Sequence, residues 1–290
     1  MKNKLQITGL LAVSLCAITL GACGGGSSYT YDSTQDVVTV SGGVIAASTD
    51  STANLRVFKA VPFAAPPVGA LRWKAPQPVV AWSGTRRSNA FSASCLMGNR
   101  PAGTPGAILY QAAPAQNEDC LYLNVWTGAG VGSGEKRPVM LLLHGGGYLL
   151  GSGAQDNYNG TGLASKGAVV VTLNYRLGAL GFLAHPELTA ETTQKASGNY
   201  ALQDAVAALQ WVKDNIVAFG GDPANVTLYS ESAGAGLSSA LLASPPARGL
   251  FHRLVTESLA ALPAGTANTT LAQAEAAGTT FATNVGAANL

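Results

Sequence analysis

Ser232 lies in a short motif that could make it a catalytic nucleophile. The motif, Ser230-Glu231-Ser232-Ala233-Gly234, follows an apolar run at 225–230 and precedes a stretch of small residues. A serine exposed on a sharp turn between a buried strand and a helix forms a nucleophile elbow, whose usual pattern is G-x-S-x-G. Here Ser230 replaces the first glycine, so a small hydroxyl side chain must fit where a β-carbon is usually absent. Serine is also a preferred helix N-cap, so this motif alone leaves a capping role open.

A second motif, "LLLHGGGY" at 141–148, could supply the other half of acyl-transfer chemistry. Its three glycines, Gly145 to Gly147, follow directly on an apolar run. Amides of residues without side chains can approach a carbonyl closely and donate hydrogen bonds to the negative oxygen that develops on it. A plain glycine-rich turn would need no histidine or tyrosine beside it. The two motifs in this order predict an oxyanion hole, and we expect His144 to orient its loop rather than act as a general base.

Four apolar runs predict the strands that must hold these two loops. They are "CLYLNVW" (120–126), "PVMLLL" (138–143), "AVVVTLNY" (168–175) and "NVTLYS" (225–230). Continuous apolar runs of this length suit central strands that are buried on both faces. Ahead of them, "VVTVSGGVIAAS" (37–48) and "LRVFKAVPFA" (55–64) predict two strands of an N-terminal antiparallel hairpin, followed by a long Pro- and Gly-rich connection from Pro66 to about Glu118.

A helix is predicted between the last two of these runs. Its apolar residues recur every three or four positions and so share one face: Leu202, Ala205, Leu209, Val212, Ile216 and Phe219. Gly220 and Gly221 should end the helix, with Pro223 beyond them. Strand, helix and strand, followed by a small-residue helix after Ser232, predict an α/β fold with a mostly parallel central sheet.

Composition limits the classes of function. The chain has 290 residues, enough for one large domain, and only 11% of them are charged. Its 17 Lys and Arg residues exceed its 15 Asp and Glu residues by two, the number contributed by Lys2 and Lys4. This balance, together with abundant alanine and glycine, is typical of a secreted globular protein and does not indicate a nucleic-acid partner.

The first residues predict an exported protein. A basic start, an apolar stretch from Leu5 to Leu20 and the small residues that follow are typical of a signal peptide at 1–22. Leu20-Gly21-Ala22-Cys23 resembles a bacterial lipobox, which predicts acylation of Cys23 and attachment to a membrane or the cell surface. Residues 23–36 would then form a flexible tether and 37–290 the folded domain. The alternative is a simple secretory peptide with an incidental cysteine, which would leave the protein secreted.

Two cysteines remain for the folded domain once Cys16 leaves with the signal peptide and Cys23 carries lipid. In an oxidising compartment this even pair, Cys95 and Cys120, should form a disulfide. Closing a loop of this length stabilises a fold by about 3–4 kcal/mol in the chain-entropy model. Two free thiols or a metal pair are the alternatives, but neither cysteine has another Cys or His at ligand spacing.

Together the motifs resemble those of type-B carboxylesterases, the family of cholinesterases, bile-salt lipases and bacterial p-nitrobenzyl esterases. The segments that carry the resemblance follow that family's order between about residues 37 and 290: "AVPFAAPPVGALRWKAPQPV", "EDCLYLNVW", "HGGGYLLGSG", "NYRLGALGFL", "GNYALQDAVAALQWVKDNIVAFGGDPANVTLYSESAGAG" and "GLFHRLV". The resemblance implies an α/β-hydrolase fold and a small-molecule ester substrate, with no metal and no cofactor. The chain departs from the family pattern at Ser230 and Ala201, where glycine is usual, and in "ESLA" at 257–260, where "QSGA" is usual.

Carried over by position, the resemblance implies roles for single residues. Ser232 would be the nucleophile, and Glu231 and His144 would line the site. The oxyanion hole would consist of the amides of Gly146, Gly147 and Ala233. The structural features implied are the family's first disulfide and an ion pair, at Cys95–Cys120 and Arg72–Glu118.

Length is the main departure from this family. Its members are about twice as long, and their acidic triad residue and catalytic histidine lie well downstream of the serine. Here 58 residues follow Ser232 (290 minus 232), and their one histidine, His252, falls in the structural motif "GLFHRL". His185, in "LAHPEL", precedes the serine and has no motif support. We therefore expect an N-terminal half with the C-terminal part missing, which lacks the triad acid and histidine and is inactive alone.

Three functions stay open at this level. The first is a serine ester hydrolase that works through an acyl-serine intermediate. The second is a non-catalytic cholinesterase-like binding module, although such relatives commonly lack the serine, and the third is an inactive gene fragment. Choline esters would need an aromatic cage for the quaternary ammonium. Residues 96–119 contain no tryptophan, where cholinesterases have their key one, so we expect a general carboxylic-ester substrate with a short or medium acyl chain.

Overall fold

The computed structural model describes residues 36–50, 53–98, 115–258 and 269–287. The predicted signal peptide (1–22), the acylated Cys23 and the tether lie outside these ranges apart from Asp36, so those boundaries stay predictions. Residues 99–114, which form most of the loop between Cys95 and Cys120, also lie outside the described ranges. No helix in the described ranges is both long and apolar enough to cross a membrane.

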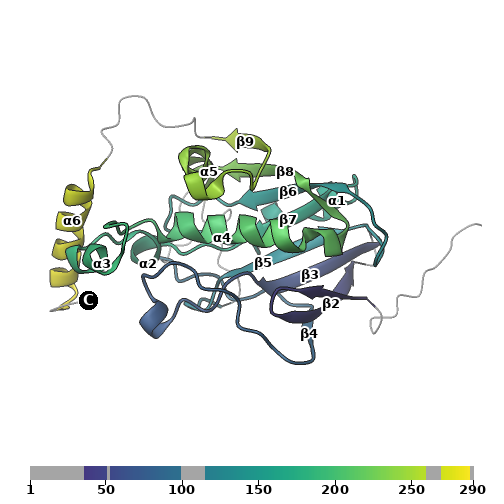
Figure 1. Ribbon diagram of the computed structural model, residues 1–290, viewed down its shortest axis with the longest axis horizontal. Helices are drawn as coiled ribbons and strands as arrows, with labels where there is room; N and C mark the ends of the chain where they lie inside the picture. The colour runs from purple at the N-terminus through teal and green to yellow at the C-terminus, as the bar shows by residue number, and fades with distance from the viewer. Residues whose placement is uncertain (1–35, 51–52, 99–114, 259–268, 288–290) are drawn as a thin grey trace, which may run out of the picture. The chain divides into compact units, whose positions relative to one another are not determined.

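A mixed sheet forms the centre of the domain (Figure 1). Its strands follow the order β1-β2-β3-β5-β7-β6-β8-β9, with β4 paired to β2 outside this path. The bounds are Val37–Val40 (β1), Gly43–Asp50 (β2), Leu55–Pro62 (β3), Thr85–Ser88 (β4), Tyr122–Thr127 (β5), Arg137–Leu143 (β6), Val169–Leu173 (β7), Gly221–Glu231 (β8) and Arg253–Glu257 (β9). Strands β7, β6, β8 and β9 run parallel, whereas the pairs from β1 to β3, β3–β5 and β5–β7 are antiparallel. The expected α/β architecture with a parallel central part is confirmed.

The N-terminal region has one strand more than the predicted hairpin. The run at 37–48, predicted as a single strand, turns back at Ser41 and Gly42, and β1 pairs with β2 through Val40 and Gly43. Gly42 has a positive φ of 98°, and a β-carbon there would collide with the ring of Trp82. Apolar residues on both sides of the turn favour one continuous strand, but the core-facing positions change from Val38 and Val40 to Ile45 and Ala47 across it. The Gly42-Gly43 pair is the turn signal that outweighs the apolar run.

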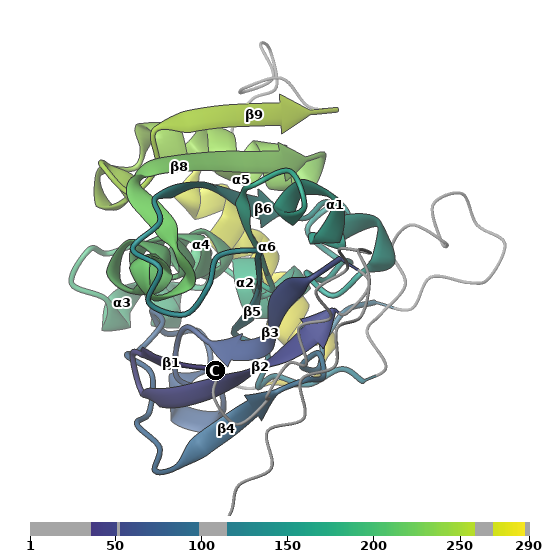
Figure 2. The same ribbon diagram turned by 90° about the vertical axis from the view of Figure 1, so that its right-hand side faces the viewer.

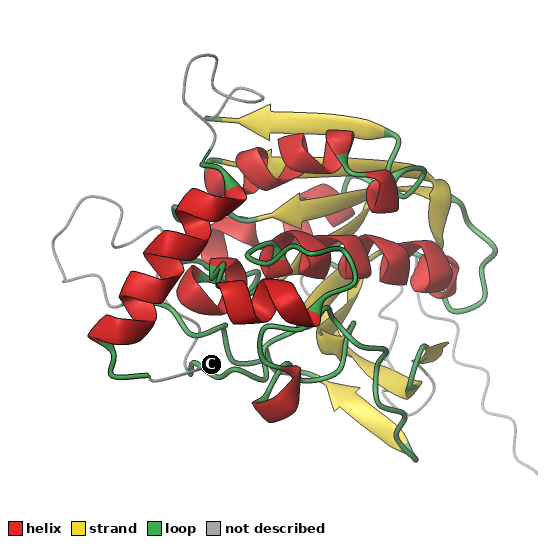
Figure 3. Ribbon diagram, turned by 60° about the vertical axis from the view of Figure 1, so that its left-hand side comes forward, coloured by secondary structure: helices red, strands yellow, loops and turns green. Residues whose placement is uncertain are grey.

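The helices divide unequally between the two faces of the sheet. On one face lie α4 (Tyr200–Asn215) and α5 (Ala233–Ala243), and on the other lies α1 (Thr161–Ala164), as Figure 2 shows. Figure 3 shows the helical layer in front of the strands. The shorter elements are α2 (Gly178–Phe182), α3 (Pro186–Glu191) and the 3₁₀ helices η1 (Gly69–Leu71), η2 (Asp156–Tyr158), η3 (Ile216–Phe219) and η4 (Pro245–Ala247), and α6 (Leu271–Asn284) follows β9.

The predicted helix after residue 200 is confirmed, with a 3₁₀ turn at its end. Its buried face includes Ala205, Leu209 and Val212, while Leu202 is half-buried. Gly220 ends the helical segment in the left-handed conformation, at φ 75°. Because this conformation is strained for residues with a β-carbon, the glycine acts as the expected stop signal.

Candidate active site

Parallel pairing of β6 and β8 brings the two predicted loops to one edge of the sheet. Leu143, the last residue of β6, pairs with Ser230 near the end of β8. The glycine loop at 145–147 follows β6, and Ser232 follows β8 directly. Since the carboxyl ends of parallel strands meet at the same edge, residues about 87 apart in the sequence become neighbours.

Ser232 has the strained backbone of an elbow. Its φ is 50° and its ψ is −121°, and its side chain makes no capping hydrogen bond to α5, which begins at Ala233. The capping role left open by the sequence is therefore not the one this serine has. Such a conformation costs about 1–3 kcal/mol and persists only where its surroundings hold it. Its amide donates to Glu257 O of β9 at 2.8 Å.

Small residues on both sides of Ser232 allow its strand and helix to pack closely. A β-carbon on Gly234 would collide with the carbonyl oxygen of Leu143 at the end of β6. Ser230, which stands where the usual pattern has glycine, is fully buried and hydrogen-bonded to Ser238 of α5 and to the carbonyl of Val255 in β9. The expectation that a small side chain must fit at Ser230 is thus met, and its hydroxyl finds partners there.

The glycine loop lies against the elbow. Gly146 and Gly147 have positive φ values of 114° and 63°. A β-carbon on Gly145 would lie 3.0 Å from Ser232 Cβ and would collide with the carboxylate of Glu231. Each glycine has its own reason: Gly145 packs against the elbow, a β-carbon on Gly146 would collide with Leu150 O, and Gly147 has open space around it but a left-handed φ that favours glycine.

Three backbone amides at this junction have no acceptor among the described residues and can bind an anion. Within the described residues, the amides of Gly146 and Gly147 donate no hydrogen bond to a protein acceptor. Ala233 is the first residue of α5, so its amide has no intrahelical acceptor. Amides that converge at a helix N-terminus favour negative charge. This arrangement can stabilise an oxyanion formed on a carbonyl carbon at Ser232.

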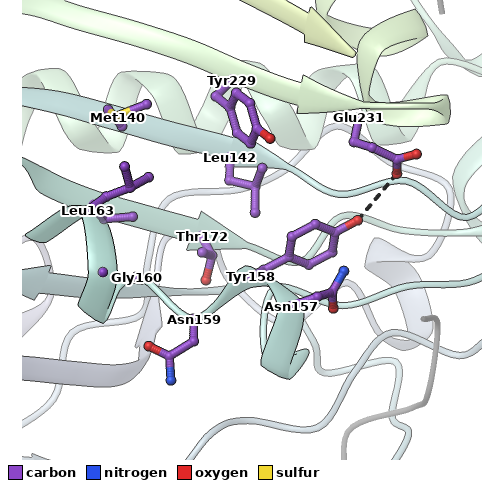
Figure 4. Close-up of a pocket in the computed structure, with 12 residues that line it drawn as sticks. Met140, Leu142, Asn157, Tyr158, Asn159, Gly160, Leu163, Thr172, Tyr229 and Glu231 are labelled. Carbon is purple, nitrogen blue, oxygen red and sulfur yellow. Dashed lines mark hydrogen bonds between the residues drawn. The ribbon is translucent and has the colours of Figure 1, made fainter. Parts of the chain in front are cut away.

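Tyr158 links the glycine loop to the elbow, a contact that the sequence analysis missed. Its hydroxyl accepts a hydrogen bond from the Gly145 amide at 3.2 Å and donates to Glu231 Oε2 at 3.4 Å (Figure 4). Tyr158 comes from η2 and lies 13 residues after Gly145 but 73 residues before Glu231. The segment "DNYNG" carries no periodic or motif signal that could have marked it.

His144 is buried and cannot serve as a general base for Ser232. Its ring stacks on Tyr175 with centroids 4.2 Å apart, and its Nδ1 lies 2.8 Å from Gly145 O. Burial lowers the pKa of His144 from 6.5 to about 4, and the Gly145 carbonyl only partly opposes this shift. The neutral ring therefore donates from Nδ1 to the carbonyl of the glycine loop. Tyr175 in turn donates from its hydroxyl to His144 O at 2.6 Å.

Neither of the other two histidines lies at the elbow. His185 is the N-cap of α3, where its Nδ1 accepts from the Glu187 amide at 3.3 Å. His252 accepts from the amide of Val226, at the opposite end of the parallel strands. Val226 precedes Ser232 by six residues of extended chain, a span of about 20 Å. Among the described residues, Ser232 Oγ has no hydrogen-bond partner.

The predicted disulfide and ion pair are both present. Cys95 and Cys120 form a disulfide with their Cα atoms 4.9 Å apart. Arg72 pairs with Glu118 at 2.8 Å in a partly exposed position. In the part of the chain that the structure describes, no three His, Cys, Asp or Glu side chains are grouped so that they could hold a metal ion.

A cavity of about 710 Å³ opens beside Glu231 on the face of the sheet that carries α1 (Figure 4). Leu142 of β6 and Tyr229 of β8 point into it from the sheet, together with Thr172 of β7. Tyr158 and Asn157 close its end next to the elbow. Its walls are mainly apolar, so it can accept the hydrocarbon part of a ligand whose polar group reaches the elbow.

Comparison with known proteins relates the whole described domain to one family. Residues 34–289 match the sequence profile of the carboxylesterase family. The chain is 47% identical over 211 residues to fumonisin B1 esterase of Sphingopyxis macrogoltabida, covering 71% of this chain and 37% of that protein. It is 42% identical over 229 residues to para-nitrobenzyl esterase of Bacillus subtilis, covering 78% of this chain and 44% of the relative.

Solved structures give the same relation. A p-nitrobenzyl esterase structure superimposes with a TM-score of 0.74 at 38% identity, covering 87% of this chain and 48% of the other. The Geobacillus stearothermophilus carboxylesterase EST55 superimposes with a TM-score of 0.75 at 36% identity, covering 87% and 49%. The chain thus spans less than half the length of each of these relatives.

Proposed function

The chain belongs to the carboxylesterase family, and on this premise we propose that it carries the nucleophile and oxyanion hole of a serine carboxylic-ester hydrolase. One observation supports the proposal above the others. The glycine loop lies against the strained Ser232. Among the described residues, neither its hydroxyl nor the three amides beside it has a hydrogen-bond partner. Free amide donors can stabilise the oxyanion of acyl transfer, and strained backbone is typical of functional sites. A turn with only a structural role would have neither feature.

The reaction begins with attack of Ser232 Oγ on the ester carbonyl carbon. The carbonyl oxygen becomes an oxyanion, which the amides of Gly146, Gly147 and Ala233 stabilise. Collapse of this intermediate breaks the carbon–oxygen bond to the alcohol, which leaves with a proton, and an acyl-serine remains. Water then attacks the acyl-serine and releases the carboxylic acid.

Proton removal from Ser232 is the step that this chain does not provide for itself. A serine hydroxyl is a weak nucleophile until a base takes its proton. None of the three histidines is placed to do so, because His144 is buried and neutral while His185 and His252 lie elsewhere. We therefore propose that the chain alone forms acyl-serine slowly and turns over little ester.

For the substrate, we propose a carboxylic ester with a short or medium acyl chain. The relatives are named for different esters, among them fumonisin B1 and the para-nitrobenzyl group, so the family supports the class and not one compound. The largely apolar cavity beside Glu231 is compatible with a hydrocarbon group.

The test is covalent capture of Ser232. A fluorophosphonate probe, from which the serine oxygen displaces fluoride, should label Ser232 slowly in the folded chain, as peptide mapping by mass spectrometry would show. Ser232→Ala should remove that label and leave the rest of the peptide map unchanged. Labels confined to lysines and tyrosines, with Ser232 unmodified after long incubation, would contradict the proposal and favour a binding module.

We also propose that the protein is exported and anchored by acyl groups at Cys23. Leu20 to Cys23 support this through their likeness to a lipobox. Two or more acyl chains would hold a protein stably on a membrane. The mature protein should partition into detergent, and Cys23→Ser should abolish this. Mass spectrometry that finds an unmodified N-terminus at residue 23 or later would refute the anchor.

A further inference from the structure

Ser230 departs from the usual elbow pattern and is fully buried. Its φ is not positive, so the backbone at this position does not require glycine. A buried hydroxyl must have partners to offset the loss of water. The two that Ser230 has come from separate elements on either side of the elbow.

The first partner is Ser238 of α5, whose Oγ lies 2.7 Å from Ser230 Oγ. The second is Val255 O of β9, at 3.0 Å. Ser238 Oγ also lies 3.0 Å from Ala235 O within its own helix. Each hydroxyl has one proton, so Ser230 donates either to Val255 O or to Ser238 Oγ, and Ser238 donates either to Ala235 O or to Ser230 Oγ. Two of the three arrangements that use both protons include a hydrogen bond between the two serines. The pair therefore joins β8 to α5, and Ser230 extends the link to β9.

These three elements are the ones that set the position of Ser232. β8 leads into it, α5 leads out of it, and β9 accepts its amide hydrogen bond through Glu257. The strained backbone of Ser232 persists only while its neighbours restrain it from several sides. Through its two hydrogen bonds, Ser230 connects β8 to both α5 and β9.

We infer that Ser230 is a positioning residue, which couples α5 and β9 to β8 and thereby holds Ser232 in its strained conformation. This inference rests on the proposed role of Ser232 as the nucleophile. Ser230 touches neither substrate nor the reacting oxygen, so it acts only through the backbone that carries Ser232.

Ser239 provides a matched control on the same helix. It is also buried, and its Oγ bonds to the same carbonyl, Ala235 O, at 2.8 Å. It has no hydrogen bond to another element in the described part of the chain. Ser239→Ala therefore removes a buried helical hydroxyl without breaking a link across the elbow.

Amide hydrogen exchange of the folded, full-length chain tests the inference without any chemistry at Ser232. The amides to follow are those of Ser232, bonded to Glu257 O, and Gly236, bonded to Ser232 O. In Ser230→Ala both should exchange about tenfold faster, since one hydrogen bond is worth about that factor. Ser238→Ala should do the same and serves if Ser230→Ala fails to fold. Exchange in Ser239→Ala should match the unaltered protein.

Labelling of Ser232 by the fluorophosphonate is the second readout, at a temperature where every variant is folded. Ser230→Ala and Ser230→Gly should slow labelling on the order of tenfold, because a small misplacement of a reacting group costs at least that much. The Ser230→Ala/Ser238→Ala double variant should be no slower than either single one, since the pair acts as a unit.

The two readouts separate the possible failures. Exchange and labelling in Ser230→Ala equal to those of Ser239→Ala, even with a lowered melting temperature, would overturn the inference and leave Ser230 a merely structural residue. If the unaltered chain shows no label at Ser232, the proposed function fails, and hydrogen exchange still decides whether Ser230 positions the elbow.

Discussion

Two neighbouring regions at the same edge of the sheet are built on opposite principles: the turns after β6 and β8, together called the unsaturated loop, and the turn after β7, called the saturated loop. After β6 and β8 the chain leaves three amides without acceptors among the described residues and holds Ser232 in strained backbone. After β7 the chain satisfies nearly every polar atom. Arg176 donates to both oxygens of the buried Asp204 and to the carbonyl of Lys74.

The difference follows from what each loop does for the fold. A buried charge is tolerable only when it is paired and fully hydrogen-bonded, so the loop after β7 must be saturated. Donors kept free at a helix N-terminus cost stability and offer a site for negative charge. The saturated loop holds the strands together, while the unsaturated one has donors left for a ligand. Four measurements test this contrast.

The largest expected effect concerns turnover at the unsaturated loop. Steady-state hydrolysis of p-nitrophenyl acetate or butyrate by this chain should be indistinguishable from that of Ser232→Ala. Loss of the histidine alone costs a serine hydrolase on the order of a millionfold in kcat, and no histidine of this chain lies at Ser232. Turnover of several per second that vanishes in Ser232→Ala would prove this wrong and would mean that His185 or His252 supplies the base.

The next effect concerns stability at the saturated loop. Asp204→Asn should lower the free energy of unfolding by about 3–5 kcal/mol, since it leaves the Arg176 charge buried and uncompensated. The exposed pair Lys74–Glu191 gives the control, and Glu191→Gln should cost at most about 1 kcal/mol. Urea denaturation measures both. Equal losses of unfolding free energy in the two variants would contradict the prediction, because the buried Arg176–Asp204 pair would then contribute no more to stability than the exposed pair.

The disulfide belongs to the saturated region, because Asn174 Nδ2 donates to Cys120 O at 3.1 Å. Replacing Cys95 and Cys120 together by serine should cost about 3.5 kcal/mol in the chain-entropy model for a loop of 25 residues. The rate of Ser232 labelling in the folded protein should stay the same. Finding both thiols alkylatable in the folded, unreduced protein would refute the prediction.

The smallest effect is a pH dependence that originates in the unsaturated loop. The pKa of His144 is about 4 in the folded chain because of its burial, against 6.5 for an exposed histidine. Between these values the unfolded chain binds more protons, so stability falls as the pH drops from 6.5 to 4. The contribution lost is about 3 kcal/mol, and it levels off below pH 4, where both states are protonated.

His144→Gln isolates this contribution from the titration of the carboxyl groups. The gap in unfolding free energy between the unaltered chain and the variant should shrink by about 3 kcal/mol from pH 7 to pH 4. His252→Gln, at the other end of the strands, is the matched control. Parallel curves for the unaltered chain and His144→Gln would contradict the prediction.

Local patterns in the chain predict most of the elements that carry the site. Apolar runs mark β6, β7 and β8, a 3.6-residue period marks α4, and Gly220 marks its end. The elbow at Ser232 and the glycine loop are also visible, because turn residues and motif spacing are local properties. The same reasoning missed the turn at Ser41 and Gly42, since apolar residues on both sides of it favour one continuous strand.

Contacts between distant segments depend on tertiary packing and carry no local signal. Tyr158 reaches Glu231 across 73 residues, and the ring of His144 stacks on Tyr175, which follows β7. Ser230, the residue that departs from the usual motif, donates a hydrogen bond to Val255 O, which lies 25 residues further along the chain. Such bonds form only when two segments lie within a few tenths of an ångström of the right separation. Periodicity and turn chemistry specify which elements form and which face they bury, but positions to that accuracy arise only when the whole sheet and its helices pack together.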